Sequence, residues 1–129
     1  MQNTRNDFER AIAEQIERAE GYVSYENNPI EYTTTKGERR RYYPDFVLCN
    51  GLIVEAKGFF RPEDRRKHKR IKEQHPELDI RIVFQNAGAR INGGSATTYA
   101  QWCRRHGIKC ASKAIPPSWF SESRRCTTV

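Results

Sequence analysis

Apolar positions recur at two different spacings along this chain, and the two spacings predict different elements. Near the start, apolar residues three or four positions apart outline one face of a helix: Phe8, Ala11, Ile12, Ile16 and Ala19. Further along, Leu78, Ile80, Ile82 and Phe84 instead alternate with Asp79 and Arg81, which is typical of a strand half-buried on one face. The chain therefore combines helices with strands.

Turn and capping residues predict the other elements. A helix is expected from Arg61 to His75, with Pro62 tolerated in its first turn and Pro76 ending it. A shorter helix is expected at about residues 98–106, where Gly107 ends it. The remaining expected segments are a strand at 22–25, a hairpin within 27–43, a short strand at 108–110, a helical turn at 116–119 and a flexible tail at 121–129.

These elements predict a single domain of the α/β or α+β class over residues 1–129, with a small mixed β-sheet flanked by helices. No apolar run approaches the roughly 18 residues that a membrane span needs, and no signal peptide is recognised. The four cysteines lack Cys-x-x-Cys spacing. Their spacing argues against zinc and indicates free thiols in a reducing cytoplasm.

The clearest local signal is a hairpin in which two apolar runs flank Asn50-Gly51. A two-residue turn would pair Asp45 with Ala56, so that Glu55 and Lys57 point away from Asp45. A three-residue loop, with its glycine in the left-handed conformation, places Asp45 opposite Glu55 and Lys57 on the same face. Both loops are common, so the local pattern leaves the register open. A site formed by the three charged residues requires the three-residue loop.

Two neighbouring carboxylates repel each other and stay ionised together only beside positive charge. A divalent cation held by Asp45 and Glu55 meets this need, because hard cations prefer oxygen ligands. Magnesium at this position, with Lys57 beside it, suits hydrolysis of a phosphodiester. The metal polarises the phosphoryl oxygen and acidifies a bound water, while the lysine holds the nucleophile or neutralises developing charge. The alternative is a surface hairpin whose Glu55 and Lys57 are only solvated.

The charge of the chain favours a polyanionic partner. Its formal net charge is +7, from 23 Lys+Arg against 16 Asp+Glu. Basic residues crowd the helix predicted after Lys57, and the start of that helix should lie near the hairpin. We therefore expect Arg66, Lys67 and Lys69 to contact phosphates. The alternative is a solvated helix with internal ion pairs.

Several segments, spread over most of residues 7–120, together resemble one nuclease family. They are Pro44-Asp45-Phe46, Asn50-Gly51, Val54-Glu55-Ala56-Lys57-Gly58, Asp64-Arg65-Arg66-Lys67-His68, Glu73 to Phe84, Gly94-Ser95, Thr98-Tyr99, His106 to Lys109, and Ile115-Pro116 with Trp119. The pattern of Asp45 followed by Glu55 and Lys57 is similar to the active-site motif of the restriction-endonuclease-like superfamily. The whole set resembles phage endonuclease I, a family of Holliday-junction-resolving enzymes, which implies a restriction-endonuclease-like core.

The resemblance implies a magnesium site that also accepts manganese and holds up to two ions. Its ligands would be the two hairpin carboxylates, the backbone carbonyl of Ala56 and a glutamate early in the first helix. The segment 8–12 matches that part of the family, so Glu9 is the corresponding fourth catalytic residue. From the residues alone, Glu9 could instead cap the helix start together with Asn6. The two roles are compatible.

The resemblance also implies a domain-swapped homodimer. In that family, the segment equivalent to 27–43 bridges two subunits, and each active site joins the first-helix glutamate of one chain to the hairpin of the other. We expect the same arrangement here, with Arg41 in the basic return of the bridge as a further DNA contact. Pairing also suits junction resolution, because two opposing strands must be cut and a two-fold dimer supplies two equivalent sites.

The predicted function is therefore a metal-dependent, structure-selective DNA endonuclease. It would resolve four-way (Holliday) junctions and other branched DNA in the cytoplasm of a phage-infected bacterial cell. Two alternatives stay open at this point. One is a sequence-specific nicking or homing-type endonuclease of the same superfamily. The other is a non-catalytic branched-DNA-binding protein, against which the intact Asp45, Glu55 and Lys57 argue.

Overall fold

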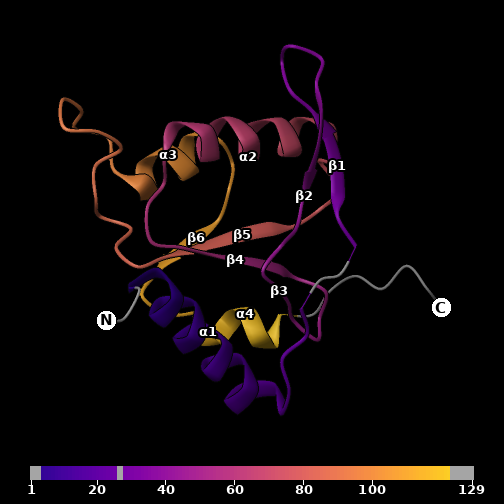
Figure 1. The fold of residues 1–129 in the computed structure, drawn as a ribbon. Coiled ribbons are helices and arrows are strands. Elements are labelled where there is room, and N and C mark those ends of the chain that lie inside the picture. The colour runs from indigo at the N-terminus through magenta and orange to yellow at the C-terminus, as the bar shows by residue number, and fades with distance from the viewer. Residues whose placement is uncertain (1–3, 26–27, 123–129) are drawn as a thin grey trace.

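A four-stranded sheet lies at the centre of the molecule, in a computed structural model that describes residues 4–25 and 28–122 (Figure 1). In order across the sheet, its strands are β3 (Phe46–Val47), β4 (Ile53–Lys57), β5 (Ile80–Phe84) and β6 (Cys110–Ser112). β3 is antiparallel to β4, whereas β4, β5 and β6 run parallel to one another. The sheet is therefore small and mixed, as predicted.

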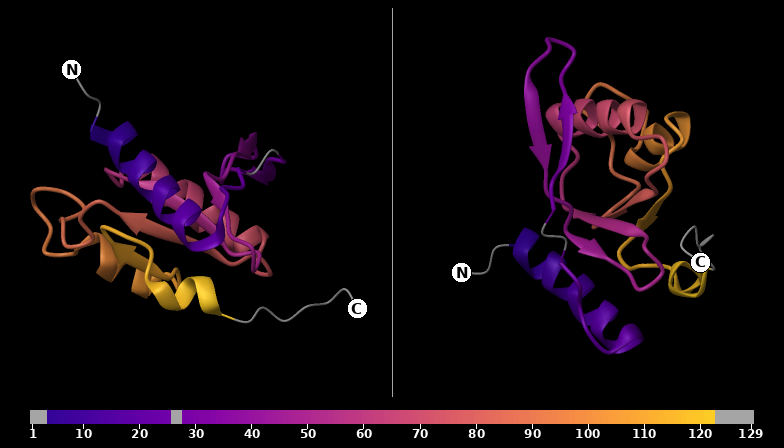
Figure 2. Two further views of the ribbon diagram at one scale, coloured as in Figure 1. Left: turned by 90° about the horizontal axis from the view of Figure 1, so that it is seen from below. Right: turned by 90° about the vertical axis from the view of Figure 1, so that its right-hand side faces the viewer.

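Helices cover both faces of this sheet, as Figure 2 shows from two further directions. One face carries α1 (Thr4–Glu20) and α4 (Pro117–Ser121), and the other carries α2 (Pro62–Gln74) and α3 (Tyr99–Arg105). The α1 face buries Phe8, Ile12, Ile16, Val54 and Val83, and the opposite face buries Phe60, Ile82, Phe84, Tyr99 and Cys103. The predicted class, a mixed sheet flanked by helices, is confirmed. None of the helices described is long and apolar enough to cross a membrane.

In the β3–β4 hairpin, Leu48 and Leu52 enclose a three-residue loop, Cys49-Asn50-Gly51. Leu48 N–H donates to the Leu52 carbonyl at 2.9 Å, and Gly51 N–H donates to the Leu48 carbonyl at 2.8 Å. Gly51 has a φ of 89°, a left-handed conformation that glycine adopts without the steric cost of a Cβ. The strands pair Phe46 with Val54, and this register places Asp45 opposite Glu55. The three-residue loop is confirmed.

The segment before the first strand of this hairpin forms a second, separate sheet. Its strands β1 (Ile30–Thr33) and β2 (Arg39–Tyr42) are antiparallel, and their turn projects beyond α2 (Figure 1). Tyr32, Tyr42 and Ile71 pack together and attach the hairpin to α2. Thr33 N–H also donates to the Gln74 side chain at 2.9 Å. The predicted hairpin is confirmed, and its role as an inter-subunit bridge stays a prediction.

The strand β5 and the C-terminal segment differ from expectation. β5 is buried on both faces, because Arg81 is only 2% exposed. Its guanidinium pairs with Asp79 at 2.8 Å and with Glu122 at 2.7 Å, as a buried cation requires. The predicted flexible tail is therefore wrong at Ser121, which ends α4, and at Glu122, which Arg81 holds. Residues 123–129 lie outside the described part of the chain.

Two smaller expectations also change. The strand predicted at 22–25 is reduced to one bridge between Ser24 and Val47. α1 begins at Thr4, so Asn6 lies inside the helix and not at the preceding position that a capping residue occupies. Cysteines described by the structure are free thiols, as predicted, and Cys126 falls among the residues left undescribed.

Candidate functional site

Asp45, Glu55 and Lys57 lie on the face of the sheet that α2 covers. The hairpin register places Asp45 opposite Glu55, and neighbouring residues of β4 such as Val54 point to the α1 face instead. Asp45 Oδ2 accepts a hydrogen bond from Ala56 N–H at 2.9 Å. Lys57 Nζ lies 3.5 Å from Glu55 Oε2. The structure thus brings together the three charged residues that the hairpin pattern singled out.

Burial gives this cluster an unusual electrostatic state. Glu55 and Lys57 are each only 5% exposed. Burial and the neighbouring Asp45 raise the pKa of Glu55 to about 7, against the opposing effects of Lys57 and of a hydrogen bond from Tyr42. Added positive charge would favour the ionised form of such a carboxylate. Two oxygen-donor groups in this state fit the hard divalent cation expected from the sequence.

Two further side chains belong to the cluster, and the sequence had not placed them there. The Tyr42 hydroxyl donates to Glu55 Oε1 at 2.7 Å, and burial raises the pKa of Tyr42 so that the hydroxyl keeps its proton. Asp64 Oδ1 lies 3.3 Å from Lys57 Nζ, while its other oxygen accepts from Arg61 N–H at the start of α2. The acidic first turn of the predicted helix was a signal for Asp64. No local pattern in the sequence indicated that Tyr42, and not the adjacent Tyr43, would reach the cluster.

Lys67 lies at the edge of the same cluster. Its ammonium nitrogen is 5.1 Å from the centre of the Tyr42 ring. Burial and the nearby Lys57 lower the pKa of Lys67, although Glu55 and the other carboxylates act against this change. A residue expected only to touch phosphate is therefore also part of the electrostatic environment of Glu55.

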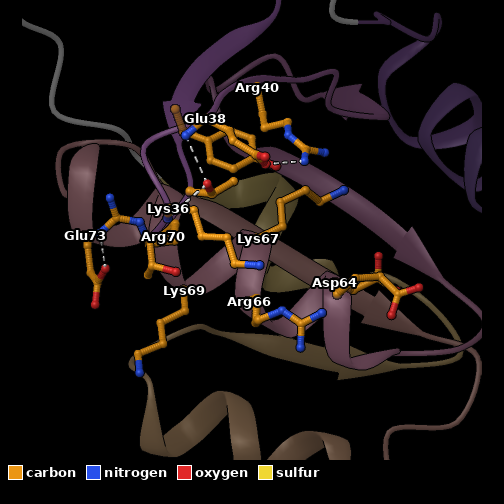
Figure 3. A pocket seen from close by; sticks show the side chains of 13 residues that line it. Lys36, Glu38, Arg40, Asp64, Arg66, Lys67, Lys69, Arg70 and Glu73 are labelled. Atoms are coloured by element: carbon orange, nitrogen blue, oxygen red, sulfur yellow. Dashed lines mark hydrogen bonds and ion pairs between the residues drawn. The ribbon is translucent and has the colours of Figure 1, made fainter.

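A groove of about 650 Å³ extends from this cluster, between the β1–β2 hairpin and α2 (Figure 3). Its basic lining residues are Lys36, Arg40, Arg66, Lys67, Lys69 and Arg70, and its acidic ones are Glu38, Glu63, Asp64 and Glu73. Some of these charges pair across short distances, as Arg40 does with Glu38 at 2.6 Å. Since Asp64 and Lys67 belong both to the groove and to the cluster, the groove leads to Glu55 and Lys57.

Three of the four predicted DNA contacts, Arg66, Lys67 and Lys69, line this groove. Arg41 does not. It lines a neighbouring hollow with Arg39 and His75, which shares Tyr32 and Arg40 with the groove. Arg40, the residue before Arg41, lines the groove. Successive residues of a strand point to opposite sides, so Arg41 points away from the side that Arg40 faces.

Glu9 and Ala56 occupy different positions relative to the cluster. Glu9 is partly exposed on α1, the helix that packs on the opposite face through Phe8 and Ile12. Among the residues described, no three His, Cys, Asp or Glu side chains form a metal-binding group, so Glu9 does not join the two hairpin carboxylates within one chain. Ala56 N–H points at Asp45, and the carbonyl of a strand residue lies on the same side as its N–H.

Comparison with known proteins identifies the family. The family model described as phage endonuclease I matches residues 1–129. Endonuclease I of Escherichia phage T7 is 41% identical over 121 residues, which cover 94% of this chain and 80% of that protein. Endodeoxyribonuclease 1 of Enterobacteria phage T3 is 40% identical over 121 residues, covering 94% and 79%. The resemblance seen in the sequence is thereby confirmed, and the chain belongs to the phage endonuclease I family.

Proposed function

We propose that this chain is a magnesium-dependent endonuclease that hydrolyses phosphodiester bonds in branched DNA, above all in four-way junctions. The observation that carries the proposal is the buried Glu55, with Lys57 3.5 Å away and the half-buried Asp45 opposite it in the β3–β4 hairpin. The names of the two relatives support the reaction class. A protein that only binds branched DNA has no use for two adjacent carboxylates, which weaken binding of a polyanion.

The residues of the chain have separate parts in the proposed reaction. Asp45 and Glu55 would hold magnesium, or manganese in its place, with the Ala56 carbonyl on the same side of β4. When bound, the cation supplies a Lewis acid and lowers the pKa of a coordinated water. Lys57, held between Glu55 and Asp64, would orient the attacking water or neutralise charge developing on the phosphoryl group. The products would carry 5′-phosphate and 3′-hydroxyl ends.

The groove beside α2 would receive one arm of the DNA. Arg66 and Lys69 line it from α2, and Lys36 lines it from the hairpin, so basic side chains stand on both walls. Phosphate contacts of this kind fix the position of the backbone without reading sequence. Such contacts suit an enzyme that binds DNA without regard to its sequence.

A domain-swapped homodimer would complete each active site. Glu9 of one chain would then join Asp45 and Glu55 of the other and hold a second ion. This proposal accounts for the absence of Glu9 from the pair that Asp45 and Glu55 form within one described chain. It also provides the two sites that cleavage of opposing strands needs.

Cleavage of a labelled four-way junction with and without magnesium tests the function. The protein should cut the junction only with magnesium and should leave a linear duplex of the same sequence intact. Lys57→Ala should slow cleavage by about 10²–10³-fold with junction binding retained, whereas Lys109→Ala, an exposed lysine, should cut normally. Cutting of the linear duplex at a fixed sequence would instead indicate a nicking or homing enzyme. Failure of the protein to cut in magnesium would indicate a DNA-binding protein.

Denaturation of Glu55→Gln tests the metal site. The folded-state pKa of Glu55, about 7, lies above the ordinary 4.5. Wild-type protein without metal therefore loses stability as the pH rises from about 4.5 to about 7. At about pH 8 in a chelator, Glu55→Gln should raise the free energy of unfolding by about 2 kcal/mol, with less effect at about pH 5. Magnesium should stabilise the wild type more than the variant.

The matched control for this measurement is Glu17→Gln, on the exposed side of α1. It should behave as the wild type at both pH values. If Glu55→Gln were no more stable than the wild type at the higher pH, and magnesium changed neither melting curve, the metal site would be refuted.

The salt dependence of junction binding tests the groove. Arg66→Ala with Lys69→Ala should weaken binding and reduce the slope of log affinity against log salt by about 1.8, the value for two lost phosphate contacts. Lys67 is left intact because it also touches Tyr42. Arg18→Ala with Lys109→Ala removes the same charge outside the groove and should leave the slope nearly unchanged. If the two double variants had equal slopes of log affinity against log salt, the groove would not be part of the DNA interface.

Mixed dimers test the swap. One chain carries Glu9→Ala and the other carries Glu55→Gln, and each variant alone should be inactive. In a swapped heterodimer, the intact Glu9 of one chain meets the intact Glu55 of the other, so one active site is restored. Refolding the two variants together should therefore recover nicking of one strand of the junction. Without a swap, each site keeps one defect and the mixture stays inactive.

A further inference from the structure

Tyr42 forms a short side-chain hydrogen bond with Glu55, although it is neither a carboxylate nor a basic residue. Its hydroxyl donates to Glu55 Oε1 at 2.7 Å, and the residue is 2% exposed. The other oxygen, Oε2, faces Lys57 Nζ at 3.5 Å. The two oxygens of one carboxylate are thus held by two different donors. Rotation of the carboxylate would break both contacts.

The Tyr42 ring is itself fixed on several sides. His68 meets it edge-on, with ring centres 5.3 Å apart and planes at 77°. Lys67 Nζ lies over its face at 5.1 Å. Ile71 of α2 packs in the same cluster. A hydroxyl carried by a ring held in this way has little freedom to leave Glu55.

The position of Tyr42 in the chain relates it to the second carboxylate. It is the last residue of β2, and Asp45 follows three residues later. The short segment 42–45 therefore carries both the hydroxyl that binds Glu55 and the Asp45 carboxylate that lies opposite Glu55. Displacement of this segment would change both at once.

We propose that Tyr42 is a positioning residue that sets the orientation of the Glu55 carboxylate for a divalent cation. The proposal rests on the proposed function, because it takes Glu55 as a metal ligand. A carboxylate oxygen has two lone pairs, so Oε1 can accept from Tyr42 and still bind a cation. Hydrogen bonds from such outer partners orient metal ligands, and their loss costs about 10–100-fold in metal affinity or activity.

Calorimetric titration of Mn²⁺ into the DNA-free protein tests the proposal. Tyr42→Phe keeps the ring, and with it the contacts to His68 and Lys67, but removes the hydroxyl. Its Mn²⁺ dissociation constant should rise by about 10-fold or more. Tyr43→Phe is the matched control, because Tyr43 is 57% exposed. That variant should bind Mn²⁺ as the wild type does.

A double variant separates positioning from a general loss of structure. If Tyr42 acts through Glu55, Tyr42→Phe should have little further effect on Mn²⁺ affinity in a Glu55→Gln background. A Tyr42→Phe affinity equal to that of the wild type would overturn the proposal, even if its melting temperature fell. So would an equal loss in both backgrounds. Absence of Mn²⁺ binding by the wild type would instead refute the metal site of the proposed function.

Discussion

The burial of Glu55 is the constraint on which the rest of the site depends. Glu55 occupies a strand in which all five residues are buried, so its carboxylate has lost most of its hydration. Burial and Asp45 favour the protonated form, whereas Lys57 and Tyr42 favour the ionised one. Of the two residues that favour the ionised form, Lys57 belongs to β4 itself and Tyr42 ends β2. The balance between them therefore exists only in the assembled fold.

Much of this arrangement follows from local sequence, because the period of a strand and the loop at Gly51 are local properties. The alternation of β4 places Glu55 and Lys57 on one face, and the three-residue loop adds Asp45 to it. A loop shorter by one residue would have turned Asp45 to the opposite face. The sequence could state this condition but could not choose between the two loops, since both suit an Asn-Gly pair.

Other parts of the site depend on contacts between distant segments, and local patterns do not reveal them. Tyr42 and Tyr43 are neighbours of the same type, yet one is 2% exposed and the other 57%. The difference arises because the β1–β2 hairpin packs on α2 through Tyr42. Arg81 is a similar case, because alternation placed it on a solvated face. Its burial depends on Glu122 and on the Trp119 ring 5.2 Å away, which come from the C-terminal segment.

The charges around Glu55 also explain how a carboxylate pair can serve a polyanionic substrate. Asp45 and Glu55 repel phosphate, and DNA would avoid them if they stood alone. Lys57 lies 3.5 Å from Glu55, and Lys67 lies at the groove end of the cluster. Burial lowers the pKa of Lys67, and repulsion between the two lysines lowers it further. Anionic DNA entering the groove would relieve that repulsion, so Lys67, which lines the groove, would also favour the approach of a phosphate.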